Sequence, residues 1–176
     1  MPQSQLAELV SSRLRDIPDF PKPGVSFKDF TPLLADHVAF SAVVDDAVAR
    51  FSGRVDAVVG IEARGFMMGA ATAYAMGVGF VPIRKAGKLP SRVHAASYAL
   101  EYGQATIEIH ADAFVPGTRV LIMDDVLATG GTAAAACDLV ERLGGTVVGV
   151  DVVVEIAALG GRAALNGREL ASVLVL

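Results

Sequence analysis

The residues best suited to chemistry lie close together, in residues 120–132. There an apolar run is followed by two acids, Asp124 and Asp125, and then by Thr129-Gly130-Gly131-Thr132. Glycines let backbone amides approach an anion closely, threonine hydroxyls add donors, and a helix that begins here directs its positive end at the same point. The stretch is neither a Walker phosphate loop nor the glycine pattern that binds dinucleotides. We therefore predict that it cradles a single phosphate group.

The two acids indicate what carries that phosphate. Neighbouring carboxylates at the end of a strand repel each other unless they bind sugar hydroxyls or meet a magnesium ion. Beside a phosphate cradle, Asp124 and Asp125 therefore favour a ribose 5-phosphate as the ligand. The alternative is purely structural, a capped helix preceded by two solvated acids. The length of the combined pattern favours binding.

A second group of charged residues follows a run of apolar residues at 78–83. The next segment carries Arg84, Lys85 and Lys88 and is interrupted by glycine and proline, which is typical of a loop. Long loops are often functional, and this one would bring positive charge to a phosphate. Basic surface loops are also common without any ligand. Glu101, farther along, alternates with apolar neighbours and by its pattern alone is a solvated hairpin residue.

Alternating helices and strands must position these residues. Apolar residues at helical spacing predict helices, and short β-branched runs predict buried strands. We expect helices at 36–51, 66–76 and 130–143, strands at 55–61, 78–83, 119–123 and 146–155, a loop at 84–96, and a hairpin at 97–101 and 105–109. This order predicts an α/β fold with a mostly parallel sheet flanked by helices. Such a sheet binds its ligand at the carboxyl ends of its strands.

The N-terminal residues have a different texture. Residues 17–25 contain three prolines, cannot form a regular helix, and are expected to lie extended over the body. Nothing in the composition divides the chain. We therefore expect one domain, residues 1–176, in which residues 1–35 form a small hood and the hairpin carries a flexible loop.

Composition excludes several classes of function. Of the 176 residues 53% are hydrophobic, and 15 Lys and Arg stand against 19 Asp and Glu, for a net charge of -4. No apolar run approaches the roughly 18 residues that a membrane helix needs, and the chain lacks a secretory signal and a basic footprint. We therefore expect a cytoplasmic protein that binds neither membranes nor nucleic acid. One cysteine, Cys137, and three separated histidines argue against disulfides and structural zinc.

Five segments together resemble a known family, the type I phosphoribosyltransferases, and within it the adenine-specific members. The segments are residues 19–29, 60–66, 82–90 and 97–103 together with the acid, threonine and glycine stretch at 120–132. The last of these resembles the signature of the whole family, and the other four resemble its adenine-specific branch. The tail, residues 157–176, departs from the pattern. The resemblance implies a purine salvage enzyme that converts adenine and 5-phosphoribosyl 1-pyrophosphate (PRPP) to AMP and pyrophosphate.

The resemblance also implies where each part of the substrates would bind. The acids Asp124 and Asp125 would hold the ribose hydroxyls, and adenine would lie between Phe27 and Val126, with its edge read by the main chain of Ser26 and Lys28. The 5-phosphate would be bound by Ala128, Thr129, Gly130, Gly131 and Thr132. The pyrophosphate would be held by Arg64 and Lys88, with Arg84 and Lys85 in the same electrostatic site. The loop at Glu62 and Ala63 often carries a cis peptide in this family.

The chemistry implied is an oxocarbenium-like displacement at the anomeric carbon of the ribose. Asp124 and Asp125 would stabilise positive charge on the sugar, and Glu101 resembles the acid that takes the proton of adenine. Magnesium would be the cofactor, bridging pyrophosphate and ribose and held through PRPP and water, with no direct protein ligand expected. The family resemblance also implies a homodimer, in which Arg84 or Lys85 reaches across the interface.

Two other functions remain open at this point. A transferase of the same fold could use hypoxanthine, xanthine or orotate, although the adenine-type segment at 19–29 argues against it. A regulator could bind PRPP without turnover, although the chain contains no added nucleic-acid-binding part and retains Glu101.

Overall fold

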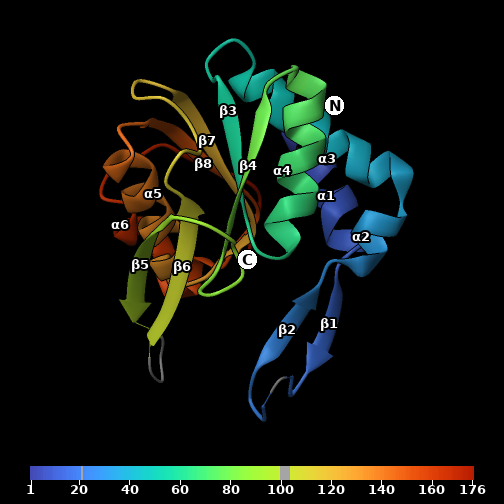
Figure 1. The fold of residues 1–176 in the computed structure, drawn as a ribbon. Helices are drawn as coiled ribbons and strands as arrows, with labels where there is room; N and C mark the ends of the chain where they lie inside the picture. The colour runs from blue at the N-terminus through green and yellow to red at the C-terminus, as the bar shows by residue number, and fades with distance from the viewer. Residues whose placement is uncertain (21, 100–103) are drawn as a thin grey trace.

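The structure is a computed structural model that describes residues 1–20, 22–99 and 104–176. Within them, seven strands form the main sheet: β3 (Ala57–Ile61), β4 (Gly79–Lys85), β5 (Val93–Ala99), β6 (Gln104–His110), β7 (Arg119–Leu127), β8 (Thr146–Glu155) and β9 (Leu170–Val175). Their order across the sheet is β5-β6-β4-β3-β7-β8-β9 (Figure 1). The five strands from β4 to β9 in this order run parallel, and the hairpin of β5 and β6 pairs antiparallel to β4.

Helices cover both faces of the sheet (Figure 1). They are α1 (Gln3–Ser12), α2 (Thr31–Ala35), α3 (His37–Phe51), α4 (Arg64–Met76), α5 (Gly131–Arg142) and the short α6 (Gly161–Ala164), and a 3-10 turn, η1, spans Ala157–Leu159. Strand β7 alternates between two cores. Val120 and Ile122 pack in the core that includes α5, while Leu121 and Met123 pack in the core that includes α1, α3 and α4. Both faces of a parallel strand are therefore buried, which confirms the predicted fold class.

Two helix ends are stabilised by residues that commonly cap helices. The Asp36 carboxylate accepts hydrogen bonds from the amides of Val38 (3.0 Å) and Ala39 (3.2 Å) and so caps α3. Gly77 ends α4 in the left-handed conformation, φ +70°, which glycine adopts without strain. The predicted helices at 36–51 and 66–76 and the strand at 146–155 are confirmed. No described helix is long and apolar enough to cross a membrane.

The loop predicted at 84–96 is wrong at both ends. Strand β4 continues through Arg84 and Lys85, which pair with Glu108 and Ile107 of β6, and β5 already begins at Val93. The connection between them is therefore residues 86–92. Strand β7 is also longer than predicted and carries both acids before it ends at Leu127. In each case pairing with a neighbouring strand satisfies the backbone, and periodicity along one segment does not reveal such pairing.

The N-terminal segment divides into two parts. Strands β1 (Arg15–Pro18) and β2 (Ser26–Asp29) form an antiparallel hairpin that projects from the body (Figure 1). Helix α1 instead packs against the body through Leu6 and Val10, which are buried in the same core as α3. Within the predicted hood, residues 1–35, only the hairpin therefore projects.

Candidate active site

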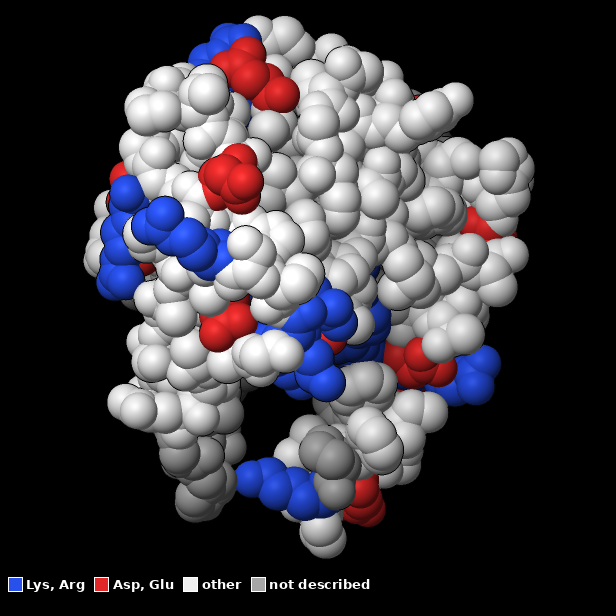
Figure 2. Space-filling view, viewed as in Figure 1, with Lys and Arg blue, Asp and Glu red and all other residues white. Residues whose placement is uncertain are grey.

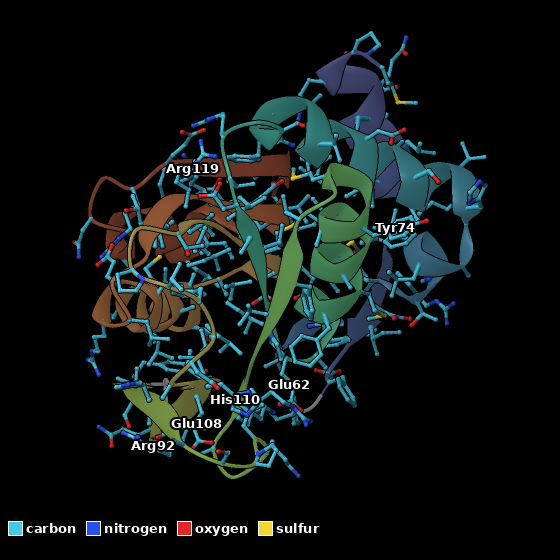
Figure 3. The ribbon with its side chains drawn as sticks, turned by 45° about the horizontal axis from the view of Figure 1, so that its top comes forward. Glu62, Tyr74, Arg92, Glu108, His110 and Arg119 are labelled. Carbon is cyan, nitrogen blue, oxygen red and sulfur yellow. The ribbon has the colours of Figure 1, made fainter. Side chains whose placement is uncertain are left out.

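A cavity of about 340 Å³ lies at the carboxyl ends of β3, β7 and β8. In Figure 3, Glu62 after β3 and Arg119 at the start of β7 lie at opposite ends of the sheet, and the cavity lies at the Glu62 end. Nine residues predicted for substrate binding line it: Ser26, Phe27, Lys28, Arg64, Asp124, Asp125, Val126, Ala128 and Thr132. A smaller hollow of about 80 Å³ adjoins it and is lined by all five residues of the predicted phosphate loop, 128–132. The fold therefore brings hairpin, acids and phosphate loop to one place.

The phosphate loop has the geometry of an anion site. Gly130 adopts φ +83° at the N-cap of α5, and its carbonyl accepts the amide of Ala134 at 2.9 Å, which starts the helix. The first amides of α5 therefore lie beside the hollow without helical partners, and such amides can bind an anion. An alanine at Gly130 would be strained by this backbone conformation.

The two acids are consecutive residues of β7, and the charge of Asp125 acts on Asp124. The amide of Asp125 donates to Oδ1 of Asp124 at 2.9 Å, and the Asp125 side chain is almost fully buried. Burial, together with the negative charge of Asp125, raises the pKa of the Asp124 carboxyl well above its usual range. Gly65 at the start of α4 packs directly on this strand, since an added Cβ there would lie 2.6 Å from the carbonyl oxygen of Met123. That close approach places the N-terminus of α4 beside the acids.

Arg64 connects the acids to the hairpin. Its Nε lies 2.7 Å from Oδ2 of Asp125, and its Nη1 donates to the carbonyl of Lys28 at 3.2 Å. Its guanidinium carbon lies 4.9 Å from the ring centroid of Phe27 and 5.4 Å from that of Phe30, within the range of cation–π attraction. In this structure Arg64 therefore lies across two residues predicted to bind adenine.

The other predicted pyrophosphate residues lie outside the cavity lining. Arg84 forms a two-pronged ion pair with Glu62, with Nε–Oε2 at 3.2 Å and Nη2–Oε1 at 3.1 Å, and the amide of Lys85 donates to the same carboxylate at 3.0 Å. The Arg84 hydrogen bonds, followed by that from Lys85, lower the pKa of Glu62. Lys85 and Lys88 are exposed, and the carbonyl of Lys88 accepts Nη1 of Arg84 at 3.2 Å. The peptide between Glu62 and Ala63 is cis, as the resemblance implies.

The 86–92 connection is held against β6. The amide of Gly87 donates to Oε2 of Glu108 at 2.9 Å, and Nε2 of His110 lies 2.8 Å from the carbonyl oxygen of Pro90. Figure 3 shows Glu108 and His110 together on this side of the sheet. Lys and Arg side chains gather where the projecting hairpin meets the body, around a deep opening (Figure 2). Such positive charge beside a cavity attracts phosphorylated ligands. Glu101, predicted to take a proton, lies outside the described residues.

Three lining residues were not predicted, Val25, Tyr98 and Ile156. The Tyr98 ring lies over the start of α5, with Cδ2 3.2 Å from where a Cβ on Gly131 would be. Ile156 directly follows β8, so the rule that ligands bind at the carboxyl ends of parallel strands could have identified it. No sequence signal places Tyr98 there, because the contact joins the hairpin to a distant loop.

The chain is similar to known proteins over its whole length. It matches the phosphoribosyl transferase domain family over residues 33–169. An adenine phosphoribosyltransferase from Salinispora tropica is 62% identical over 172 residues, which are 97% of this chain and 91% of the relative.

Solved structures agree with this similarity. The adenine phosphoribosyltransferase from Thermoanaerobacter pseudethanolicus superposes with a TM-score of 0.93 at 46% identity, covering 97% of this chain and 99% of that one. The enzyme from Saccharomyces cerevisiae, in complex with an imino-altritol bisphosphate and adenine, has a TM-score of 0.91 at 39% identity, with coverage of 97% and 99%. The chain therefore belongs to the phosphoribosyltransferase family and, within it, to the adenine phosphoribosyltransferases.

Proposed function

We propose that this protein transfers the phosphoribosyl group of PRPP to adenine and releases AMP and pyrophosphate. The observation that carries the proposal is that one cavity and the hollow adjoining it bring together an acid pair, a phosphate loop and an aromatic hairpin. The relatives named above are adenine phosphoribosyltransferases, and the yeast structure holds an imino-altritol bisphosphate and adenine. An enzyme from Giardia lamblia, solved with 9-deazaadenine, has a TM-score of 0.90 at 38% identity.

Adenine would enter between Phe27 and Val126, which line the cavity from the hairpin and from β7. The main chain of Ser26 and Lys28 would read its edge, so the Lys28 carbonyl would have to exchange its bond from Arg64 for one from the base. Arg64 would then be available to the pyrophosphate, as predicted for it. The Lys28 carbonyl would thus serve adenine, and the Arg64 side chain would serve the pyrophosphate of PRPP.

The sugar would lie over β7. The 5-phosphate would be bound by the amides and hydroxyls of residues 128–132, and the ribose hydroxyls by Asp124 and Asp125. As the bond to pyrophosphate lengthens, positive charge grows on the ribose. That charge would favour the ionised form of Asp124, so the two acids would stabilise it more than they stabilise the substrate. We propose Glu101 as the group that takes the proton lost by adenine.

Magnesium remains a proposal that fits the donors in the cavity. Within residues 1–20, 22–99 and 104–176 there is no cluster of three or more histidine, cysteine or acidic residues that could hold a metal. Mg²⁺ keeps several waters and binds substrate phosphates, so PRPP and water would hold it, and the two acids of β7 that line the cavity could accept hydrogen bonds from those waters. When bound, the ion would neutralise charge on the departing pyrophosphate. Of the protein's own side chains, Arg64 would add positive charge beside the pyrophosphate.

A homodimer is also part of the proposal. Helix α4 presents an outer stripe of Met67, Ala70 and Tyr74, and Tyr74 is 91% exposed (Figure 3). Exposed apolar residues at helical spacing favour burial against another surface. Light scattering would test this, and an active strict monomer would contradict a role for any residue from a second subunit. The cytoplasmic location stays a prediction, which cell fractionation would test.

The test of the activity is pyrophosphate release from PRPP in the presence of magnesium, with adenine, hypoxanthine, guanine, xanthine, orotate or no base. Release with adenine alone, together with AMP, is the expected result. Release with another base would keep the phosphate site but contradict the assignment of the hairpin. Tight PRPP binding without release would contradict the transferase and favour a PRPP sensor.

A further inference from the structure

The C-terminal tail packs directly against the back of the phosphate loop. Gly161, the buried first residue of α6, lies so close that an added Cβ would be 2.2 Å from the carbonyl oxygen of Ala128 and 2.9 Å from the amide nitrogen of Gly130. From the other side, a Cβ on Gly130 would lie 2.3 Å from the carbonyl oxygen of Gly161. Such distances are far below van der Waals contact. Two glycines therefore allow the two backbones to touch.

An ion pair holds this part of the tail in place. Arg162 forms a two-pronged bond to Glu155, the last residue of β8, with Nε–Oε1 at 3.0 Å and Nη2–Oε2 at 2.6 Å. The hydroxyl of Ser172 donates to the same Oε2 at 3.1 Å. The Glu155 side chain is only 8% exposed, so the pair is shielded on one side and its geometry is well defined. At the other end of α6, Leu165 is fully buried in the core that includes α5.

We propose that Gly161 and Arg162 are positioning residues for the 5-phosphate, an inference that rests on the proposed function of the loop. The backbone of residues 160–165 supports the loop from behind and fixes the direction of the amides at 129–131. Hydrogen bonds to an anion weaken steeply when donors are misaligned, so a small displacement of the Ala128 peptide is felt at the phosphate. The tail, which departs from the family pattern in sequence, thereby acquires a role in substrate binding.

The central test is Gly161→Ala. Gly161 lies in α6 and outside the left-handed region, so alanine is compatible with its backbone and the change acts through the contact with the Ala128 carbonyl. Ribose 5-phosphate is the probe, measured by calorimetry, because it needs the phosphate site but undergoes no reaction. We expect its dissociation constant to rise by about 10-fold or more, the effect of losing one hydrogen bond to a charged group. In turnover assays the KM for PRPP should rise while the KM for adenine does not.

Gly79→Ala is the matched control. Gly79 begins β4, has no positive φ, and an added Cβ there meets nothing within 4 Å. The control should bind ribose 5-phosphate like the wild type.

A second variant keeps the inference testable if Gly161→Ala does not fold. Arg162→Gln changes a side chain that is 56% exposed and breaks the ion pair without adding bulk. It should weaken ribose 5-phosphate in the same direction, and Arg162→Lys should restore part of the affinity. Its control is Arg54→Gln, which breaks a similar two-pronged pair with Glu169 that lies outside the cavity lining.

The outcomes separate this inference from the proposed function. Wild-type affinity for ribose 5-phosphate in Gly161→Ala, or in Arg162→Gln if only that variant folds, would overturn the positioning role. A lower unfolding temperature with unchanged affinity would also overturn it, because the tail would then be only structural. If the wild type binds ribose 5-phosphate but forms no AMP, the transferase proposal fails, and loss of binding in the variants still supports the inference.

Discussion

Asp151, a buried acid in β8, offers a quantitative test of how burial changes a pKa and, through it, the stability of the protein. It lies in β8, is only 3% exposed, and its Oδ1 is 3.4 Å from Nη1 of Arg50 on α3. Arg50 is shared with Asp46, with which it forms a second ion pair. Burial raises the pKa of Asp151 to about 7, opposed by the charge of Arg50 and reinforced by that of Asp46. The charged groups that act on Asp151 are therefore one cation, Arg50, and one further acid, Asp46.

The sign of the effect on stability follows from this shift. Between pH 4 and pH 7 the folded protein keeps a proton on Asp151 that the unfolded chain has lost, so the free energy of unfolding falls as pH rises. Raising the pKa of Asp151 from 3.8 to about 7 contributes about 4 kcal/mol to the free energy of unfolding at low pH. This contribution is lost as pH rises above 7. Asp151→Asn removes this titration. The unfolding free energy of the variant minus that of the wild type should therefore rise by about 2.5 kcal/mol from pH 5 to pH 8.

The assay is urea unfolding followed by circular dichroism at pH 5, 6, 7 and 8. The protein concentration is held fixed because association would shift the apparent stability. Asp45→Asn is the matched control, since Asp45 is exposed on the same helix as Arg50. Its difference from the wild type should not change with pH. A difference for Asp151→Asn that is equally flat, or that falls toward pH 8, would refute the reasoning from burial.

Three further predictions concern the site and its surroundings. Asp124→Asn should lower turnover by about 100-fold or more without lowering the unfolding free energy at pH 7, since burial already disfavours the charged form; turnover like that of the wild type would remove the ribose contact from its role. Glu101→Ala should lower kcat while calorimetry still detects PRPP, and abolished PRPP binding with normal turnover of the residual complex would contradict proton transfer. Burial raises the pKa of the Cys137 thiol to about 11, so a thiol reagent at pH 8 should modify it only after unfolding, and rapid labelling of the native protein would contradict this.

The pattern of neighbouring residues predicted much of the fold. Apolar spacing predicted α3, α4 and β8, because helix and strand periods depend on residues only a few positions apart. The phosphate loop was also predictable, since its glycines, threonines and helix start are contiguous at 129–132. Nine of the residues named for substrate binding line the cavity, and their roles stay predictions.

Contacts between distant segments were decided only by the tertiary structure. Pairing with β6 extended β4 through Arg84 and Lys85, and Glu62 then held Arg84 outside the cavity lining. Arg64 reached both Asp125 and Lys28, and Gly161 came to support the phosphate loop.

Short stretches of sequence were enough to predict the fold class, the phosphate loop and the acid pair. The tertiary structure decided which charges meet, as at Arg64 and Asp125, and which group is buried, as at Asp151. The two kinds of feature differ in how far apart in the sequence the interacting residues lie. Periodicity and capping depend on residues a few positions apart, whereas burial, ion pairs and backbone contacts depend on where the folded chain places segments that are remote in sequence.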